Sequence, residues 1–83
     1  MTECYVLLHS IQDVREFVSA ASLSHVDIDA ISGRYTVDAK SIMGLFSLEL
    51  QAPLLLRIYG DEAEGEKFKA SISHLLTERP KEM

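Results

Sequence analysis

The segment Lys40-Ser41-Ile42-Met43-Gly44-Leu45-Phe46-Ser47-Leu48 concentrates five apolar side chains in one short run. Its spacing predicts a short helix, and Ser41 can cap that helix because its side-chain oxygen can accept a hydrogen bond from a backbone N–H one turn further on. One apolar stripe runs along one side, and Met43 and Phe46 fall on a neighbouring stripe. So short a helix cannot bury both stripes against a single core. Part of this surface is therefore expected to be exposed, which is typical of a docking site.

A β-hairpin is predicted immediately before this segment. Val26–Ile31 alternates apolar and acidic residues, which is typical of a strand with one face in water. Ser32-Gly33 predicts a two-residue turn, since glycine adopts the positive φ angle that such turns need, and Arg34–Asp38 returns as the second strand. The turn and the apolar pattern together predict four facing pairs: Ala30 with Tyr35 and Ile28 with Val37 on one face, and Asp29 with Thr36 and Asp27 with Asp38 on the other.

The N-terminal part of the chain predicts a strand followed by a helix. Cys4–Leu8 is rich in residues that suit a half-buried strand. Ser10 with Asp13 three residues later resembles a capping box, which marks a helix start. Apolar residues then recur at helical spacing, and this first helix is expected to end near Leu23.

The C-terminal part predicts a fourth strand and a last helix. Pro53 ends the short helix, and Leu54–Tyr59 follows as a strand. Arg57 is expected on the exposed face of the sheet, beside Asp27 or Asp29. The acidic run after Gly60 suits the first turn of a helix that begins between residues 61 and 66, and residues 77–83 are expected to form a frayed tail.

The order of elements is strand, helix, strand, strand, short helix, strand, helix. Helices laid on one face of an antiparallel sheet form an α+β open sandwich, and 83 residues make a single domain, residues 1–83. The net charge of −5 argues against nucleic acid and anionic membranes as partners. No apolar run approaches the ~20 residues of a membrane span, and the lone Cys4 cannot form an internal disulfide, so a reducing cytoplasm is expected.

The helical segment that starts at Lys40 also resembles the regulatory-serine segment of HPr, the histidine-containing phosphocarrier of the sugar phosphotransferase system. The matching residues are Lys40–Gly44 and Phe46–Leu48, and the likeness extends without gaps from about Ile11 to Tyr59. The resemblance implies four antiparallel strands with three helices on one side. It also implies a serine-kinase site at Ser41 and a docking surface for protein partners, such as that kinase or a transcriptional regulator of carbon metabolism, formed by Ile42, Met43 and Phe46.

HPr-like carriers have a nucleophilic histidine at the start of the first helix, followed by alanine and arginine, and the resemblance implies where these positions fall in this chain. The helix amides and the arginine hold the phosphoryl oxygens. Counting back from the serine segment puts Ser10 at the histidine position, Gln12 at the arginine position and Asp13 at a proline position. A serine cannot form the labile phosphoramidate, and a carboxylate would repel phosphate. Phosphocarrier chemistry is therefore not expected at Ser10.

Two alternatives remain open for the neighbouring residues. A shortened loop could slide His9 into the histidine's place, with Arg15 as the cation; otherwise His9 is a solvated residue at a strand end. Ser41 is either a phosphorylation site or a helix cap and nothing more.

No other chemistry is predicted. His25 and His74 have no cysteine or carboxylate at metal-ligand spacing, so no metal site and no cofactor are expected. The chain shows no paired carboxylates in a cleft, no glycine-rich phosphate loop and no nucleophile with a base, so it is not expected to be an enzyme. The leading hypothesis is a regulatory or protein-interaction module controlled through Ser41. The alternatives are a phosphocarrier that uses His9 and a binding module of unrelated function on the same fold.

Overall fold

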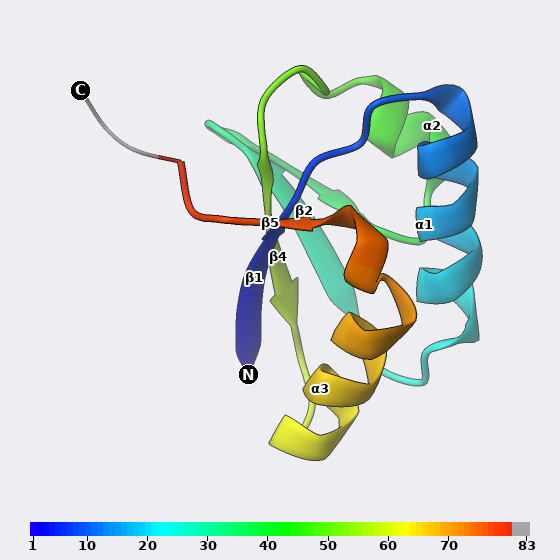
Figure 1. The fold of residues 1–83 in the computed structure, drawn as a ribbon, viewed down its shortest axis with the longest axis vertical. Coiled ribbons are helices and arrows are strands. Elements are labelled where there is room, and N and C mark those ends of the chain that lie inside the picture. Colours follow the sequence, from blue (N-terminus) through cyan, green and yellow to red (C-terminus); the bar gives the residue numbers. More distant parts are fainter. Residues whose placement is uncertain (81–83) are drawn as a thin grey trace.

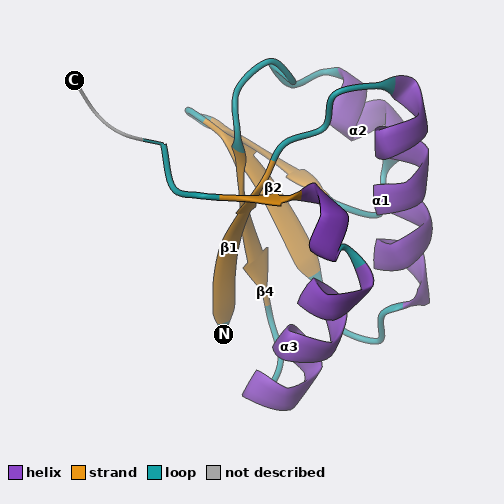
Figure 2. Ribbon diagram, viewed as in Figure 1, coloured by secondary structure: helices purple, strands orange, loops and turns teal. Residues whose placement is uncertain are grey.

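The computed structural model describes residues 1–80 as one antiparallel sheet with the helices on one side (Figures 1 and 2). The elements follow the predicted order, with one addition at the C-terminal end. They are β1 (Thr2–Val6), α1 (Ile11–Leu23), β2 (Ile28–Ser32), β3 (Tyr35–Asp38), α2 (Ile42–Phe46), β4 (Leu54–Ile58), α3 (Glu62–Ser71), a 3₁₀ turn (Ser73–Leu75) and β5 (Leu76–Thr77). The α+β open sandwich is therefore confirmed. None of the helices within the described range is long and apolar enough to cross a bilayer.

The sheet has the strand order β3-β2-β4-β1-β5, so the fifth strand is an addition to the predicted four. The 3₁₀ turn after α3 redirects the chain, and Leu76 and Thr77 then pair with Val6 and Tyr5. Leu7 N also donates a hydrogen bond to Leu75 O at 3.0 Å. The prediction of a frayed tail from residue 77 is thus wrong at its start, because the outer edge of β1 offers backbone groups that need partners. The last part of that tail, residues 81–83, lies outside the described range.

The hairpin forms, but its register differs from the predicted one by two residues. Asp29 faces Asp38, Ala30 faces Val37 and Ser32 faces Tyr35, so the turn residues are Gly33 and Arg34. Gly33 has φ +58° and Arg34 a negative φ, as in a type II′ turn, which requires glycine at the first central position. A shift of two residues keeps every side chain on its predicted face.

The bounds of β1 correct one prediction, and the surroundings of Arg57 confirm another. β1 begins at Thr2 and ends at Val6, so Leu7 and Leu8 belong to the connection to α1. Arg57 faces both Glu3 and Asp29 across the sheet, but its Nε bonds Glu3 Oε2 at 2.9 Å. The predicted position of Arg57 beside Asp29 is therefore confirmed, although its ion pair is with Glu3.

The core lies between the sheet and the helices. Phe17 of α1 and Phe68 of α3 pack edge to face, with ring centroids 6.1 Å apart, and the inward residues of the strands close the layer beneath them. Gly65 of α3 lies directly against Thr2, because a Cβ on this residue would overlap the threonine side chain. This glycine weakens the helix by about 1 kcal/mol relative to alanine. It also lets α3 approach β1 closely.

Candidate functional site

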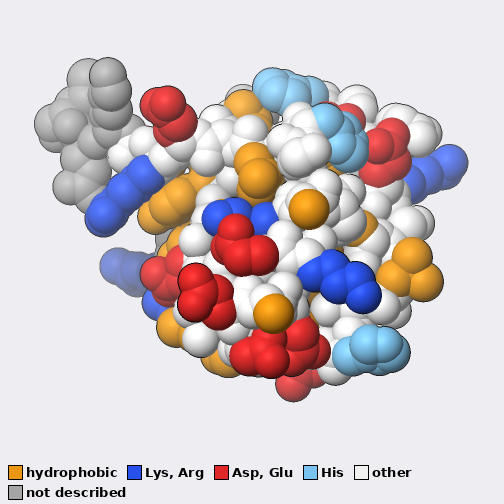
Figure 3. All heavy atoms as spheres, turned by 60° about the horizontal axis from the view of Figure 1, so that its bottom comes forward, with side chains coloured by type: hydrophobic (Ala, Val, Ile, Leu, Met, Phe, Trp, Pro, Cys, Tyr) orange, Lys and Arg blue, Asp and Glu red, His pale blue; other side chains and the backbone are white. Residues whose placement is uncertain are grey.

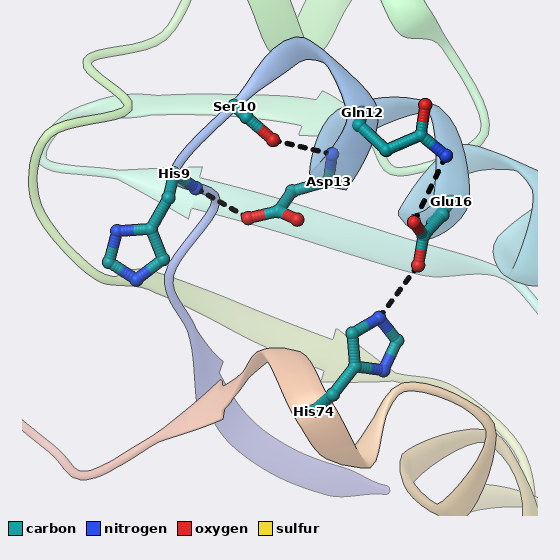
Figure 4. A network of polar contacts seen from close by, with 6 residues as sticks. All are labelled: His9, Ser10, Gln12, Asp13, Glu16 and His74. Carbon is teal, nitrogen blue, oxygen red and sulfur yellow. Dashed lines mark hydrogen bonds and ion pairs between the residues drawn. The ribbon is translucent and has the colours of Figure 1, made fainter.

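The first turn of α1 is organised by Ser10 and Asp13. Ser10 is the N-cap, with extended backbone angles, and its Oγ accepts a hydrogen bond from Asp13 N at 3.1 Å. Asp13 Oδ2 in turn accepts one from the backbone N of His9 at 2.8 Å (Figure 4). The capping interaction predicted from these residues is thus present, and it closes one residue earlier than in the usual box.

His9 precedes this cap, and only its backbone takes part in it. Figure 4 shows the imidazole pointing away from Ser10 and from α1. Arg15 lies on the exposed side of α1, and within residues 1–80 it makes no hydrogen bond or ion pair with His9. The cap therefore holds the His9 backbone in place and leaves its ring free in solvent.

A second contact, which the sequence did not suggest, joins α1 to the 3₁₀ turn. Glu16 accepts hydrogen bonds from Gln12 Nε2 at 3.1 Å and from His74 Nε2 at 2.8 Å (Figure 4). The bond from Gln12, followed by that from His74, lowers the pKa of Glu16 below its ordinary value. Since 58 residues separate the histidine from the glutamate, only the packing of α3 against α1 brings them together.

This contact predicts a pH dependence of stability. The pKa of Glu16 is lower in the folded chain than in the unfolded one, so its contribution is complete above the unfolded pKa and is lost as the pH falls through the folded pKa. Urea unfolding midpoints measured between about pH 5 and pH 3 should fall less steeply for Glu16→Gln than for the wild-type chain. Equal slopes for the two chains would contradict the role given to this carboxylate.

The short helix α2 presents the predicted serine and apolar surface. Ser41 is its N-cap, and Ser41 Oγ accepts a hydrogen bond from Gly44 N at 3.1 Å. Leu45 is buried in the core, whereas Met43 and Phe46 are 77% and 45% exposed. Of the three expected patch residues, Met43 and Phe46 are thus exposed to solvent, whereas Ile42 is partly buried against the core.

A groove connects the end of α2 with the start of α1. It has a volume of about 380 Å³ and lies between the connection after β1 and the segment after α2. Its walls include His9, Ser10 and Phe46, with Ile11, itself 62% exposed, at the rim. The two stretches singled out in the sequence, around Ser10 and after Ser41, therefore share one surface.

The surface around the start of α3 is chemically mixed. On the face that carries the start of α3, acidic and basic side chains are interspersed and hydrophobic ones form only separate spots (Figure 3). His25 lies in the connection after α1. Across residues 1–80, no group of three or more histidine, cysteine or acidic residues could hold a metal ion.

Solved structures show which known fold this is. HPr-C-His from Thermoanaerobacter tengcongensis superposes with a TM-score of 0.74 at 26% identity, over 89% of this chain and 89% of that one. The chain has the HPr fold.

Other HPr structures agree with this assignment. The phosphocarrier protein HPr from Bacillus anthracis gives a TM-score of 0.69 at 26% identity, over 89% of this chain and 95% of that one. The histidine-containing phosphocarrier protein of a mycoplasma gives 0.65 at 16% identity, over 88% and 86% of the two chains, and shares the fold. No protein-family model and no curated protein matches the sequence. The likeness to HPr thus lies in the arrangement of the elements more than in the residues.

Proposed function

We propose that this HPr-like chain is a cytoplasmic regulatory or protein-interaction module related to the phosphotransferase system, controlled by phosphorylation on Ser41. The observation that carries the proposal is the exposed Ser41 hydroxyl at the start of α2, with exposed Met43 and Phe46 on the same helix. A kinase can reach such a hydroxyl without unfolding the domain. The partners expected are proteins, with a serine kinase and a regulator of carbon metabolism as the leading classes.

The environment of Ser10 supports a role other than phosphate transfer. In the proposed correspondence, Ser10 stands where the carriers have their histidine. Its hydroxyl oxygen is engaged with Asp13 N, and the Asp13 carboxylate lies in the same turn of helix. That carboxylate would repel an incoming phosphoryl group, and Gln12 brings no positive charge to offset it.

Phosphate on Ser41 would act through charge rather than through a change of fold. A phosphoserine carries about −1.5 to −2 charge at pH 7, and its oxygens can still accept the hydrogen bond from Gly44 N. The charge would stand next to the apolar Met43 side chain. A partner that docks through apolar contacts alone would then be disfavoured, and one with an arginine or lysine near that edge would be favoured.

The test is phosphorylation by a serine kinase of this system with ATP, followed by intact mass and fragment mapping. We expect one phosphate, located on Ser41 and lost in Ser41→Ala. Ser47→Ala is the matched control, because Ser47 is an exposed serine at the other end of the same helix. An unchanged mass, or a phosphate that persists in Ser41→Ala, would remove the proposal.

A second candidate, phosphate transfer through His9, is favoured by one observation: His9 lines the groove beside α2. The same samples can be incubated with phosphoenolpyruvate and the first enzyme of the system. Under the leading proposal no acid-labile adduct forms. An adduct that disappears in His9→Ala and persists in His74→Ala would establish the second candidate instead.

A further inference from the structure

The outer edge of the sheet at β3 pairs with no other strand of residues 1–80. β3 is the last strand of the order β3-β2-β4-β1-β5, and the residues from Arg34 to Thr36, with Asp38, are exposed. Helix α2 packs over the flat side of β3, since a Cβ on Gly44 would lie 3.1 Å from Val37 Cβ. The row of backbone groups along the edge is left open to another strand.

The direction of each backbone group follows from one measured hydrogen bond. Ala39 N donates to Ile28 O at 2.9 Å, and bonded and non-bonded pairs alternate along an antiparallel ladder. Val37 and Tyr35 therefore bond β2, while Thr36 and Asp38 turn their backbone groups outward. The Asp38 carbonyl accepts from Ser41 N at 2.9 Å. The Asp38 N–H and both backbone groups of Thr36 are free to pair.

We propose that β3 pairs with β3 of a second copy of this chain, antiparallel and centred on Thr36, to form a two-fold symmetric dimer with a continuous sheet. The sequence of the edge is self-complementary in this register. Arg34 stands opposite Asp38 of the second copy, and Tyr35 opposite Val37. The first pair joins opposite charges and the second an aromatic with a β-branched residue, both favourable across strands. Tyr35 is 73% exposed in the single chain.

Charge selects this register over its neighbours. Hydrogen bonds form only in registers that set the outward-facing positions of one copy opposite those of the other. A pairing centred on Asp38 would place two carboxylates opposite each other, and one centred on Arg34 two guanidinium groups. Pairings centred on Tyr35 or Val37 set a charged residue opposite Thr36. The Thr36-centred pairing alone matches each charge with its opposite.

The acidic surroundings of Asp38 strengthen the case for an arginine from outside. Asp27, Asp29 and Asp38 line one shallow hollow on the open face of the sheet, together with Tyr59. Within the described residues Arg34 has no ion pair of its own. In the dimer, the Arg34 side chain of one copy would stand beside the acidic hollow of the other.

The dimer should be weak and visible only at high concentration. It pairs one short strand per copy, whereas a stable interface engages about 20–30 residues on each side. Sedimentation equilibrium of the unmodified chain from about 10 μM to about 1 mM should show a rising mass that approaches twice that of the chain. A single-chain mass at the highest concentration would overturn the proposal.

A pair of charge reversals identifies the register. Arg34→Asp and Asp38→Arg each place like charges opposite each other in the dimer. We therefore expect each to weaken dimerisation at least about tenfold. An equimolar mixture of the two variants restores both opposite-charge pairs, so it should form a mixed dimer at the concentrations at which the unmodified chain dimerises. Dimerisation that is unchanged in the single variants, or not recovered in the mixture, contradicts the pairing.

Asp38→Arg could disturb the fold, because Asp38 Oδ1 accepts a hydrogen bond from Lys40 N at 2.9 Å. Thr36→Pro is therefore a second test of the edge pairing that leaves this bond in place. Proline at position 36 removes only an N–H that points away from β2, which an edge strand tolerates. This variant should melt cooperatively and remain single at every concentration. A Thr36→Pro chain that still dimerises would refute the edge pairing. None of these measurements depends on phosphorylation of Ser41.

Discussion

Replacing Phe17 with alanine is expected to lower the free energy of unfolding by about 3–5 kcal/mol. The Phe17 ring is fully buried and meets Phe68 of α3 edge to face. The substitution therefore removes apolar contacts with α3 and with the core. A chain of this length has a total stability of roughly 4–12 kcal/mol. Urea unfolding followed by far-ultraviolet circular dichroism measures the change.

Phe46→Ala is the matched control for Phe17→Ala. It removes the same side chain from α2, where 45% of the residue is already exposed. Its effect on stability should therefore be much smaller, about 1 kcal/mol or less. Equal losses in the two variants would mean that the burial of Phe17 does not explain its contribution.

The second large effect is expected for Gly60→Ala, which should cost about 2–5 kcal/mol. Gly60 joins β4 to α3 with φ +138°, a backbone conformation that residues with a Cβ rarely adopt. An added Cβ would also lie 2.6 Å from Val26 Cγ1. Backbone strain and overpacking therefore act together, and thermal and urea unfolding should both show the loss.

Two further variants separate the causes at Gly60. Gly33→Ala also places alanine at a positive φ, but nothing lies within 4 Å of its Cβ, so it should show strain alone, about 1–2 kcal/mol. Adding Val26→Ala to Gly60→Ala removes the atom that the new Cβ meets. The double variant should then lose less stability than the two single losses added together. Simple additivity would show that the close contact plays no part.

Much of the fold could be predicted because periodicity and capping act locally. The alternation from Val26 to Ile31 and the caps at Ser10 and Ser41 depend on neighbours within four residues, and all three have counterparts in the structure. The face of each hairpin residue was also predicted correctly. The exact register was not, because Ser32-Gly33 and Gly33-Arg34 both satisfy the glycine requirement of a tight turn, and only one matches the strand ends.

The features that sequence reasoning missed all depend on distant partners. β5 exists because β1 has an open edge, and a run as short as Leu76–Thr77 carries no periodic signal. Arg57 bonds Glu3, 54 residues away, whereas the carboxylate of Asp29 on its other side accepts a hydrogen bond from Tyr59. From the sequence, Gly65 is only a residue that weakens a helix. Its close contact with Thr2 depends on how α3 packs against β1.

The candidate site shows the same division. The exposure of Met43 and Phe46 followed from the excess of apolar residues on a short helix. That His9 and Ser10 share a groove with Phe46 could not be deduced, since it depends on how α1 and α2 pack. The bond between His74 and Glu16 likewise has no local signature.

The position of β1 between β4 and β5 has a consequence for synthesis on the ribosome. Once translated, β1 finds no neighbour until Leu54–Ile58 and then Leu76–Thr77 have followed it. At about 5–20 residues per second, β1 waits several seconds with its apolar face uncovered. Closure of the sheet around β1 is therefore delayed, and chaperones that shield nascent segments have their opportunity at this strand.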